Sequence, residues 1–196
     1  MSRLAGYQAP RDKLRQLRRR GEVIRIKKGL YVPGWRGGEE MPVDPLVLSG
    51  LIYRPSYVSL ETALAVHGLI PERVEETSCI TSKRARHFVT PVGRFRYIPV
   101  NERVFPYGVG LKKARGGSYL MAEPEKALCD RVARIRNLTA ARDVARVLAE
   151  DLRIERGAVL EFRLPLVEAI AARYRRKSVR AFHSWLAREL KSRVTT

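Results

Sequence analysis

The chain has 196 residues with a formal net charge of +19, and 45% of its residues are hydrophobic. This length and apolar content suffice for a hydrophobic core, while the two cysteines, Cys79 and Cys129, are too few for a disulfide-rich secreted scaffold. No apolar run approaches the roughly 20 residues of a membrane-spanning helix, and no signal segment opens the chain, so we expect a soluble, cytoplasmic protein without membrane contacts.

The positive charge is concentrated at the two ends of the sequence. Residues 1–36 hold eleven Lys and Arg against two acidic residues, and residues 153–196 hold eleven against four. Such clusters favour a polyanionic partner such as nucleic acid. The alternative is a generally arginine-rich proteome, in which every protein surface is basic and the excess charge has no special role.

Residues 10–20, PRDKLRQLRRR, predict a short helix. Proline suits the first turn, arginines in the last turn complement the negative end of the helix dipole, and Gly21 is a stop signal. Only Leu14 and Leu17 are apolar, so a narrow stripe should pack inward. The opposite face is rich in side chains that read base edges. It holds Arg11, Asp12, Arg15, Gln16 and Arg19.

Residues 21–34, GEVIRIKKGLYVPG, predict a two-stranded hairpin. Two β-prone runs flank Lys27-Lys28-Gly29, where the glycine supplies the positive φ of a tight turn. We expect the apolar residues of both runs to anchor the hairpin on a core and to leave Lys27 and Lys28 outside at the tip.

A linker and two helices follow in the sequence. The Gly- and Pro-rich run at 34–45 marks a domain boundary, and helices are expected over 44–53 and 59–67. Ser59 is the candidate N-cap of the second helix, and Gly68 ends it.

The next part of the chain predicts strands. Three β-prone runs at 77–81, 86–92 and 94–100, with a Pro-Val-Gly turn between the last two, indicate a small antiparallel sheet. A further short run covers 119–122.

The remainder of the chain reads as helical. One helix should begin at Glu123-Pro124-Glu125, a second at Thr139, and a closing pair should cover 166–174 and 178–190.

No residue pattern in the sequence indicates catalysis, a metal or a cofactor. The histidines His67, His87 and His183 lack metal-ligand spacing, and each is expected to be structural or superficial. A phosphate loop of the GxxxxGK[ST] type is missing, and so is a complete dinucleotide fingerprint. We therefore expect a protein that is not an enzyme and binds neither cofactor nor metal.

The segment EPEKALCD, residues 123–130, places Glu125, Lys126 and Asp130 together. A nuclease of the D/E-x-K type needs an acid two residues before its lysine, and that position is Pro124. Acidic residues near a helix start and a Lys126–Asp130 pair at i, i+4 favour a structural role instead.

A basic helix followed by a hairpin is typical of the recognition helix and wing of a winged helix-turn-helix module. Arginine and glutamine on the helix can bind guanine and adenine in the major groove, and basic residues of the wing can contact phosphates. The alternative is a solvated basic helix beside an ordinary surface hairpin. The predicted base-reading residues are Arg11, Arg15, Gln16 and Arg19, and the predicted backbone contacts are Arg25, Lys27 and Lys28.

Four segments occur in an order that resembles the AbiEi-like antitoxins of type IV, abortive-infection toxin-antitoxin systems. They are GEVIRIKKGLYVP at 21–33, YVSLETALAVHGLIPE at 57–72, ITSKRARHFVTPVGRFRYIPV at 80–100 and AEPEKALCDRVA at 122–133. The resemblance covers most of residues 21–133.

The resemblance implies a transcriptional autorepressor that binds operator repeats in double-stranded DNA and opposes a nucleotidyltransferase-like toxin. The expected fold is α+β: a truncated winged helix-turn-helix region at 1–36, then a mixed α/β domain at 37–196 with a small antiparallel sheet and a helical C-terminal part. Only nine residues precede the predicted recognition helix. Either a later helix, such as 44–53, covers its apolar side, or the chain starts later than in its relatives.

Two other functions fit parts of the sequence. An RNA-binding or ribosome-associated basic protein would use the basic segment 173–177 and aromatic residues on a sheet face, for which Phe88, Phe95 and Tyr97 are the candidates. An enzyme that reverses the toxin's modification would need a catalytic set, and none is visible in the sequence.

Overall fold

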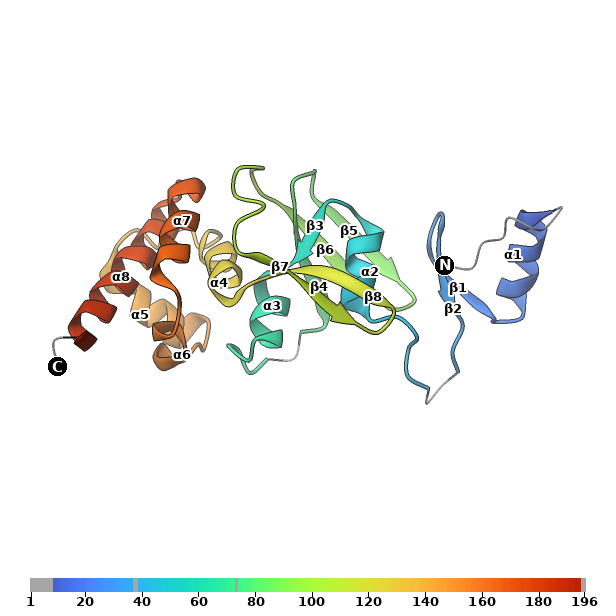
Figure 1. Cartoon of the computed structure of the whole chain (residues 1–196), viewed down its shortest axis with the longest axis horizontal. Helices are drawn as coiled ribbons and strands as arrows, with labels where there is room; N and C mark the ends of the chain where they lie inside the picture. Colours follow the sequence, from blue (N-terminus) through green and yellow to red (C-terminus); the bar gives the residue numbers. More distant parts are fainter. Residues whose placement is uncertain (1–8, 37–38, 73, 195–196) are drawn as a thin grey trace.

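The computed structural model describes residues 9–36, 39–72 and 74–194, and it is an elongated α+β arrangement (Figure 1). A helix and a hairpin form one end, a sheet with two helices forms the middle, and further helices form the other end. Within the described residues, no helix combines the length and apolar content that crossing a lipid bilayer requires.

The N-terminal end consists of the predicted helix and the predicted hairpin. Helix α1 stops where Gly21 adopts a φ of +72°, and a turn with Gly29 at +80° joins the two antiparallel strands. Both positive φ values are natural for glycine and costly for other residues. The elements are α1 (Pro10–Arg19), β1 (Val23–Lys27) and β2 (Leu30–Pro33).

The central sheet differs from the predicted small antiparallel sheet. It has six strands in the order β5-β6-β4-β3-β8-β7, with parallel pairing of β4 with β6 and of β3 with β8. Sequence patterns identified the β5–β6 hairpin, but pairing between strands distant in the chain has no local signal. The strands are β3 (Ser56–Val58), β4 (Glu76–Thr81), β5 (Arg86–Thr90), β6 (Gly93–Pro99), β7 (Val109–Ala114) and β8 (Gly117–Ala122).

Helices cover both faces of this sheet. Helix α2 (Pro45–Ile52) lies on one face, where Tyr97 of β6 donates a hydrogen bond to the carbonyl of Ser49 at 2.7 Å. Helix α3 (Leu60–Val66) lies against β4, where the Thr62 hydroxyl accepts a hydrogen bond from the amide of Ser78 at 2.8 Å. Both helices were predicted, and their apolar sides fill the core.

Helix α2 does not cover the apolar side of α1, which corrects one sequence-based expectation. The hairpin lies between α1 and α2 (Figure 1), and its Ile26 and Val32 join the same hydrophobic core as α2. Leu14 and Leu17 of α1 stay only partly buried. Any support that residues 1–8 give to α1 lies outside the described residues.

The C-terminal third is helical, as predicted, but less regular. The expected helix from Thr139 is instead a series of short helical turns. The amides of Leu152 and Ile154 donate to the carbonyls of Val147 and Leu148, which lie further back in the chain than the i−4 partner of an α-helix. The elements are α4 (Pro124–Val132), η2 (Ala141–Asp143), α5 (Val144–Arg146), η3 (Val147–Asp151), α6 (Arg156–Leu160), α7 (Leu164–Tyr174) and α8 (Lys177–Val194).

A buried polar cluster joins the sheet to these helices. Asp130 of α4 accepts hydrogen bonds from Lys126 at 2.6 Å, Tyr57 at 3.0 Å, Ser59 at 2.6 Å and Tyr174 at 2.5 Å. The Ser59 hydroxyl is therefore used here and does not cap α3, contrary to the expectation. Because the donors come from β3, α4, α7 and the start of α3, one carboxylate fixes four segments in place.

Candidate nucleic-acid interface

All four predicted base-reading side chains lie on the exposed surface of α1. Arg11, Arg15, Gln16 and Arg19 are exposed, and no residue of this helix is buried. Arg15 forms an ion pair with Asp12 at 3.2 Å, with about two thirds of each side chain exposed. Such a surface pair contributes little to stability, so Arg15 can exchange Asp12 for another acceptor.

The hairpin presents only part of its predicted basic set to solvent. Arg25 and Lys28 are exposed, and Arg25 is the cross-strand partner of the half-buried Tyr31. Antiparallel partners share a face of the hairpin, so Arg25 and Tyr31 lie side by side on the face away from the core. Tyr31 was not among the predicted residues, although the hairpin register is a signal that could have found it.

Lys27 departs from the prediction that it points outward from the tip. The register shifts between Arg25 and Lys27, and Lys27 becomes the partner of Leu30, whose face packs inward. The ammonium donates a hydrogen bond to the carbonyl of Ile52, at the C-terminal end of α2. A β-bulge thus turns Lys27 toward the negative end of a helix, where cations are stabilised.

Two further arginines, Arg18 and Arg20, are exposed at the end of α1 and were not selected by the helical projection. Arg20 lies 3.8 Å from Glu22, whereas Arg18 has no ion pair within the described residues. Arg18 lies in the last turn of α1 and Arg20 follows it as the C-cap, so both add positive charge where the helix leads into the hairpin.

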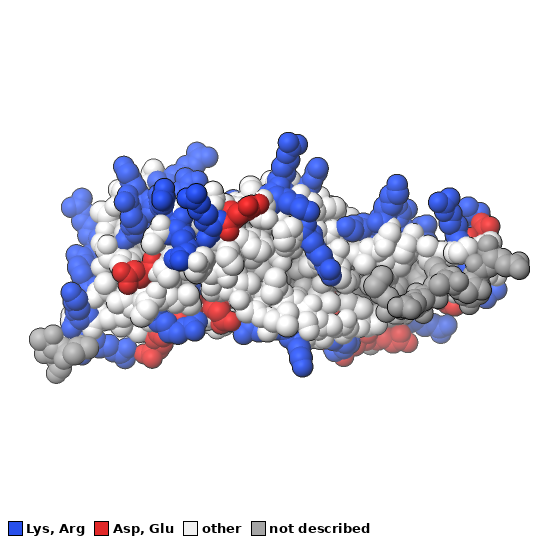
Figure 2. Space-filling model, turned by 45° about the horizontal axis from the view of Figure 1, so that its top comes forward, with Lys and Arg blue, Asp and Glu red and all other residues white. Residues whose placement is uncertain are grey.

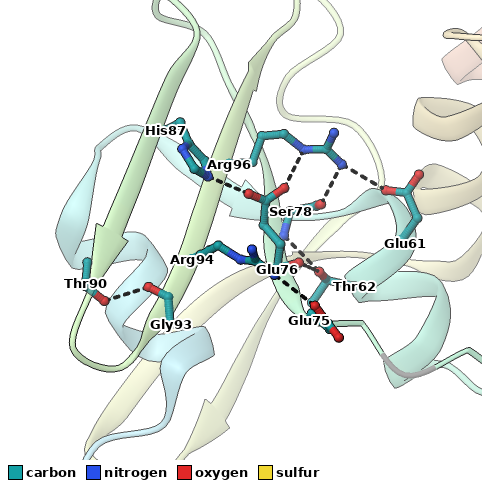
Figure 3. A network of polar contacts seen from close by, with 10 residues as sticks. All are labelled: Glu61, Thr62, Glu75, Glu76, Ser78, His87, Thr90, Gly93, Arg94 and Arg96. Atoms are coloured by element: carbon teal, nitrogen blue, oxygen red, sulfur yellow. Dashed lines mark hydrogen bonds and ion pairs between the residues drawn. The ribbon is translucent and has the colours of Figure 1, made fainter.

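The basic residues of the central sheet are mostly neutralised by neighbours (Figure 3). Arg96 contacts Glu76 at 3.0 Å, Arg94 contacts Glu75 at 2.8 Å, and His87 bonds the other oxygen of Glu76 at 2.7 Å. Lys and Arg side chains crowd the helical end and recur along one edge toward α1 (Figure 2). The arginines that face Glu75 and Glu76 are therefore partly neutralised, whereas the exposed arginines of α1 and its C-cap, other than Arg15 and Arg20, have no ion pair within the described residues.

The histidines show no arrangement suited to a metal. His67 donates from Nε2 to the carbonyl of Ala122 at 2.8 Å, and His87 is bonded to Glu76. Within the ranges that the structure describes, no three His, Cys, Asp or Glu side chains come together as ligands.

The Lys126–Asp130 pair lies in the interior, with both residues at most 1% exposed. Burial raises the pKa of Tyr57 and Tyr174, and the Asp130 carboxylate raises both further, so the two phenols stay protonated as donors. Glu125 is held by Arg163 through three hydrogen bonds. A structural role agrees with this geometry, because Glu125, Lys126 and Asp130 are buried and each has a charged partner.

Of the three aromatic residues proposed for an RNA-binding sheet, two are buried and Phe88 is half-buried. Phe95 and Tyr97 are fully buried, and Phe88 packs edge-on against Tyr97 with ring centroids 5.7 Å apart. Side chains in the core beneath α2 cannot stack on bases.

The chain matches no known protein-family model, and no curated protein is significantly similar to it in sequence.

Proposed function

We propose that this protein binds double-stranded DNA through α1 and the β1–β2 hairpin and acts as a transcriptional repressor. The observation that carries the proposal is the fully exposed face of α1, where Arg11, Arg15, Gln16 and Arg19 project from one short helix. Arginine and glutamine are the side chains that make bidentate contacts with guanine and adenine in the major groove.

The hairpin supplies the second part of the interface. Arg25 and Lys28 are exposed on the hairpin that directly follows α1 in the chain, and we assign this hairpin the role of a wing. Phosphate contacts from these two residues would fix the orientation of α1 on the duplex without reading sequence.

The antitoxin role rests on the resemblance of the segments at 21–33, 57–72, 80–100 and 122–133. On this proposal, the protein represses its own operon and opposes a nucleotidyltransferase-like toxin. The central sheet and the C-terminal helices, anchored by the Asp130 cluster, would then carry the antitoxin activity.

A competition binding assay tests the DNA-binding proposal. A labelled duplex from upstream of the protein's own gene is competed with the same duplex unlabelled, with random duplex and with RNA of equal length, at two salt concentrations. We expect the upstream duplex to compete best, and Arg15→Glu to weaken its binding by at least about tenfold, or about 1.4 kcal/mol.

The matched control is Arg103→Glu, which makes the same charge change at an exposed residue of the loop after β6. An equal loss with Arg103→Glu would show that only overall charge matters and would contradict the assignment to α1. Preferential competition by RNA would favour the RNA-binding alternative.

A further inference from the structure

An open cavity of about 640 Å³ lies at the helical end of the molecule, between the segment after α4 and the turn from α7 to α8. Its size falls within the range of about 300 to 1,000 Å³ that is typical of small-molecule sites. This end lies opposite α1 along the long axis (Figure 1), so the cavity is separate from the proposed DNA interface.

The lining of the cavity carries strong positive charge and no acidic residue. Five basic residues contribute to it: Arg134, Arg136, Arg175, Arg176 and Lys177. Within the described residues, none of the five forms an ion pair of 4 Å or less. This contrasts with the sheet, where Arg94 and Arg96 have carboxylate partners.

The cations come from two segments that the fold brings together. The first follows α4, and the second is the α7–α8 turn, where Arg175 adopts a left-handed conformation with φ +52°. This conformation is natural for glycine and strained for an arginine. Burial is the main cause that lowers the pKa of Arg134; Tyr174 and Asp130 oppose this, and Arg176 adds a smaller lowering.

Helix α8 begins at the cavity, and Ser178 in its first turn lines it. Ser178 is only 5% exposed, yet its hydroxyl has no hydrogen-bond partner within the described residues. Because Ser178 lines the open cavity, its hydroxyl is accessible there and can donate a hydrogen bond to a bound anion. The amides in the first turn of a helix are also unpaired, and they favour an anion.

From these observations we propose that the cavity binds a compact polyphosphate anion, such as the triphosphate group of a nucleotide. Five converging cations, a free hydroxyl and a helix N-terminus match several phosphoryl groups held close together. The only apolar lining residues, Ala133 and Ile135, are small or aliphatic. With no aromatic side chain to stack on a base, recognition should depend on the phosphates and be indifferent to the base.

Isothermal titration calorimetry of the full chain tests this proposal. The probes are inorganic triphosphate, ATP, GTP and sulfate. At about 0.15 M salt, charge–charge interactions across the protein surface are screened over distances beyond roughly 8 Å. We expect saturable 1:1 binding of triphosphate, similar affinity for ATP and GTP, and much weaker binding of sulfate. A duplex with the same total phosphate concentration should not displace the triphosphate.

Two variants and a control locate the site. Arg176→Ala combined with Lys177→Ala should weaken triphosphate binding by at least about tenfold, and Ser178→Ala should weaken it by a smaller factor. Arg188→Ala, which removes an exposed arginine of α8 away from the cavity, should change the affinity by less than about twofold. Circular dichroism confirms that each variant remains folded.

Several results would overturn the proposal. They are an absence of saturable triphosphate binding, an equal loss in the Arg188→Ala control, or displacement by duplex DNA with no effect of the cavity variants. None of these results bears on the competition binding assay with DNA, since that assay depends on α1 at the opposite end of the molecule.

Discussion

The ammonium of Lys27 donates a hydrogen bond to the carbonyl of Ile52, the last residue of α2. Two adjacent lysines at a hairpin turn thus have different environments: Lys27 is turned inward and half-buried, whereas Lys28 is exposed. The bulge between Arg25 and Lys27 is the cause, because it places Lys27 on the same face as Leu30.

Lys27→Ala and Lys28→Ala should therefore have different effects. Losing the Lys27 hydrogen bond should reduce the free energy of unfolding by about 1 to 2 kcal/mol, as measured by urea denaturation, and leave the salt dependence of DNA binding unchanged. Lys28→Ala should leave stability unchanged and reduce the slope of log K against log salt by about 0.9, the value for one phosphate contact. An interchange of the two effects would contradict both the bulge geometry and the wing assignment.

Gln16→Ala should reduce sequence preference more than overall affinity. If Gln16 contacts an adenine in bidentate fashion, its loss costs about 1 to 3 kcal/mol on the preferred duplex and little on random DNA. Binding titrations with both duplexes measure the difference, and Arg25→Ala serves as the comparison because a phosphate contact weakens both equally. Equal losses for Gln16→Ala on the two duplexes would exclude a base contact.

Lys126→Met should be strongly destabilising. It leaves Asp130 as an uncompensated buried charge, and breaking such pairs costs about 3 to 5 kcal/mol. Lys112→Met is the matched control, since its ammonium lies 3.7 Å from Glu123 on a side chain that is 39% exposed. The control should cost less than about 1 kcal/mol, and similar urea midpoints for the two variants would argue against a structural role of the buried pair.

The contact of Arg163 with Glu125 should make stability depend on pH. Burial alone raises the pKa of Glu125, but the hydrogen bonds from Arg163 outweigh it and hold this pKa below its usual value. Glu125 therefore adds stability above its unfolded-state pKa of about 4.3, and the contribution is lost as the pH falls through the lower folded-state pKa.

Removing Arg163 should reverse the sign of this contribution. In Arg163→Met, burial without a partner raises the pKa of Glu125, so protonation of Glu125 favours folding. The difference in the free energy of unfolding between the variant and the wild type should therefore narrow as the pH falls from 7 toward about 3. Urea denaturation across this range measures the difference. In a Glu125→Gln background the difference should no longer vary with pH, and a persistent variation would assign the effect to another group.

Cys79 and Cys129 should not react with thiol reagents in the native protein. Both thiols are fully buried and free, and burial raises the pKa of Cys79 to about 12 and that of Cys129 as well. Because the thiolate is the reactive form, a colorimetric disulfide reagent at pH 8 should label neither thiol before urea is added and both afterwards. Rapid native labelling would show that the core opens locally.

The elements with strong local signals were predictable from the sequence. Pro10 and Gly21 bracket α1, Gly29 sets the hairpin turn, and the acidic residues beside Pro124 open α4. The exposed face of α1 followed from helical periodicity alone, because a helix with two apolar residues can bury only one narrow stripe.

Tertiary structure decided which side chains are available to a partner. A bulge turned Lys27 inward, and packing against α2 removed Phe95 and Tyr97 from the surface. The sheet order and the basic cavity likewise depend on segments that are distant in the chain, such as those containing Arg134 and Arg176. Periodicity and turn residues specify local conformation, whereas the side chains that meet across distant segments are fixed only when the core is packed.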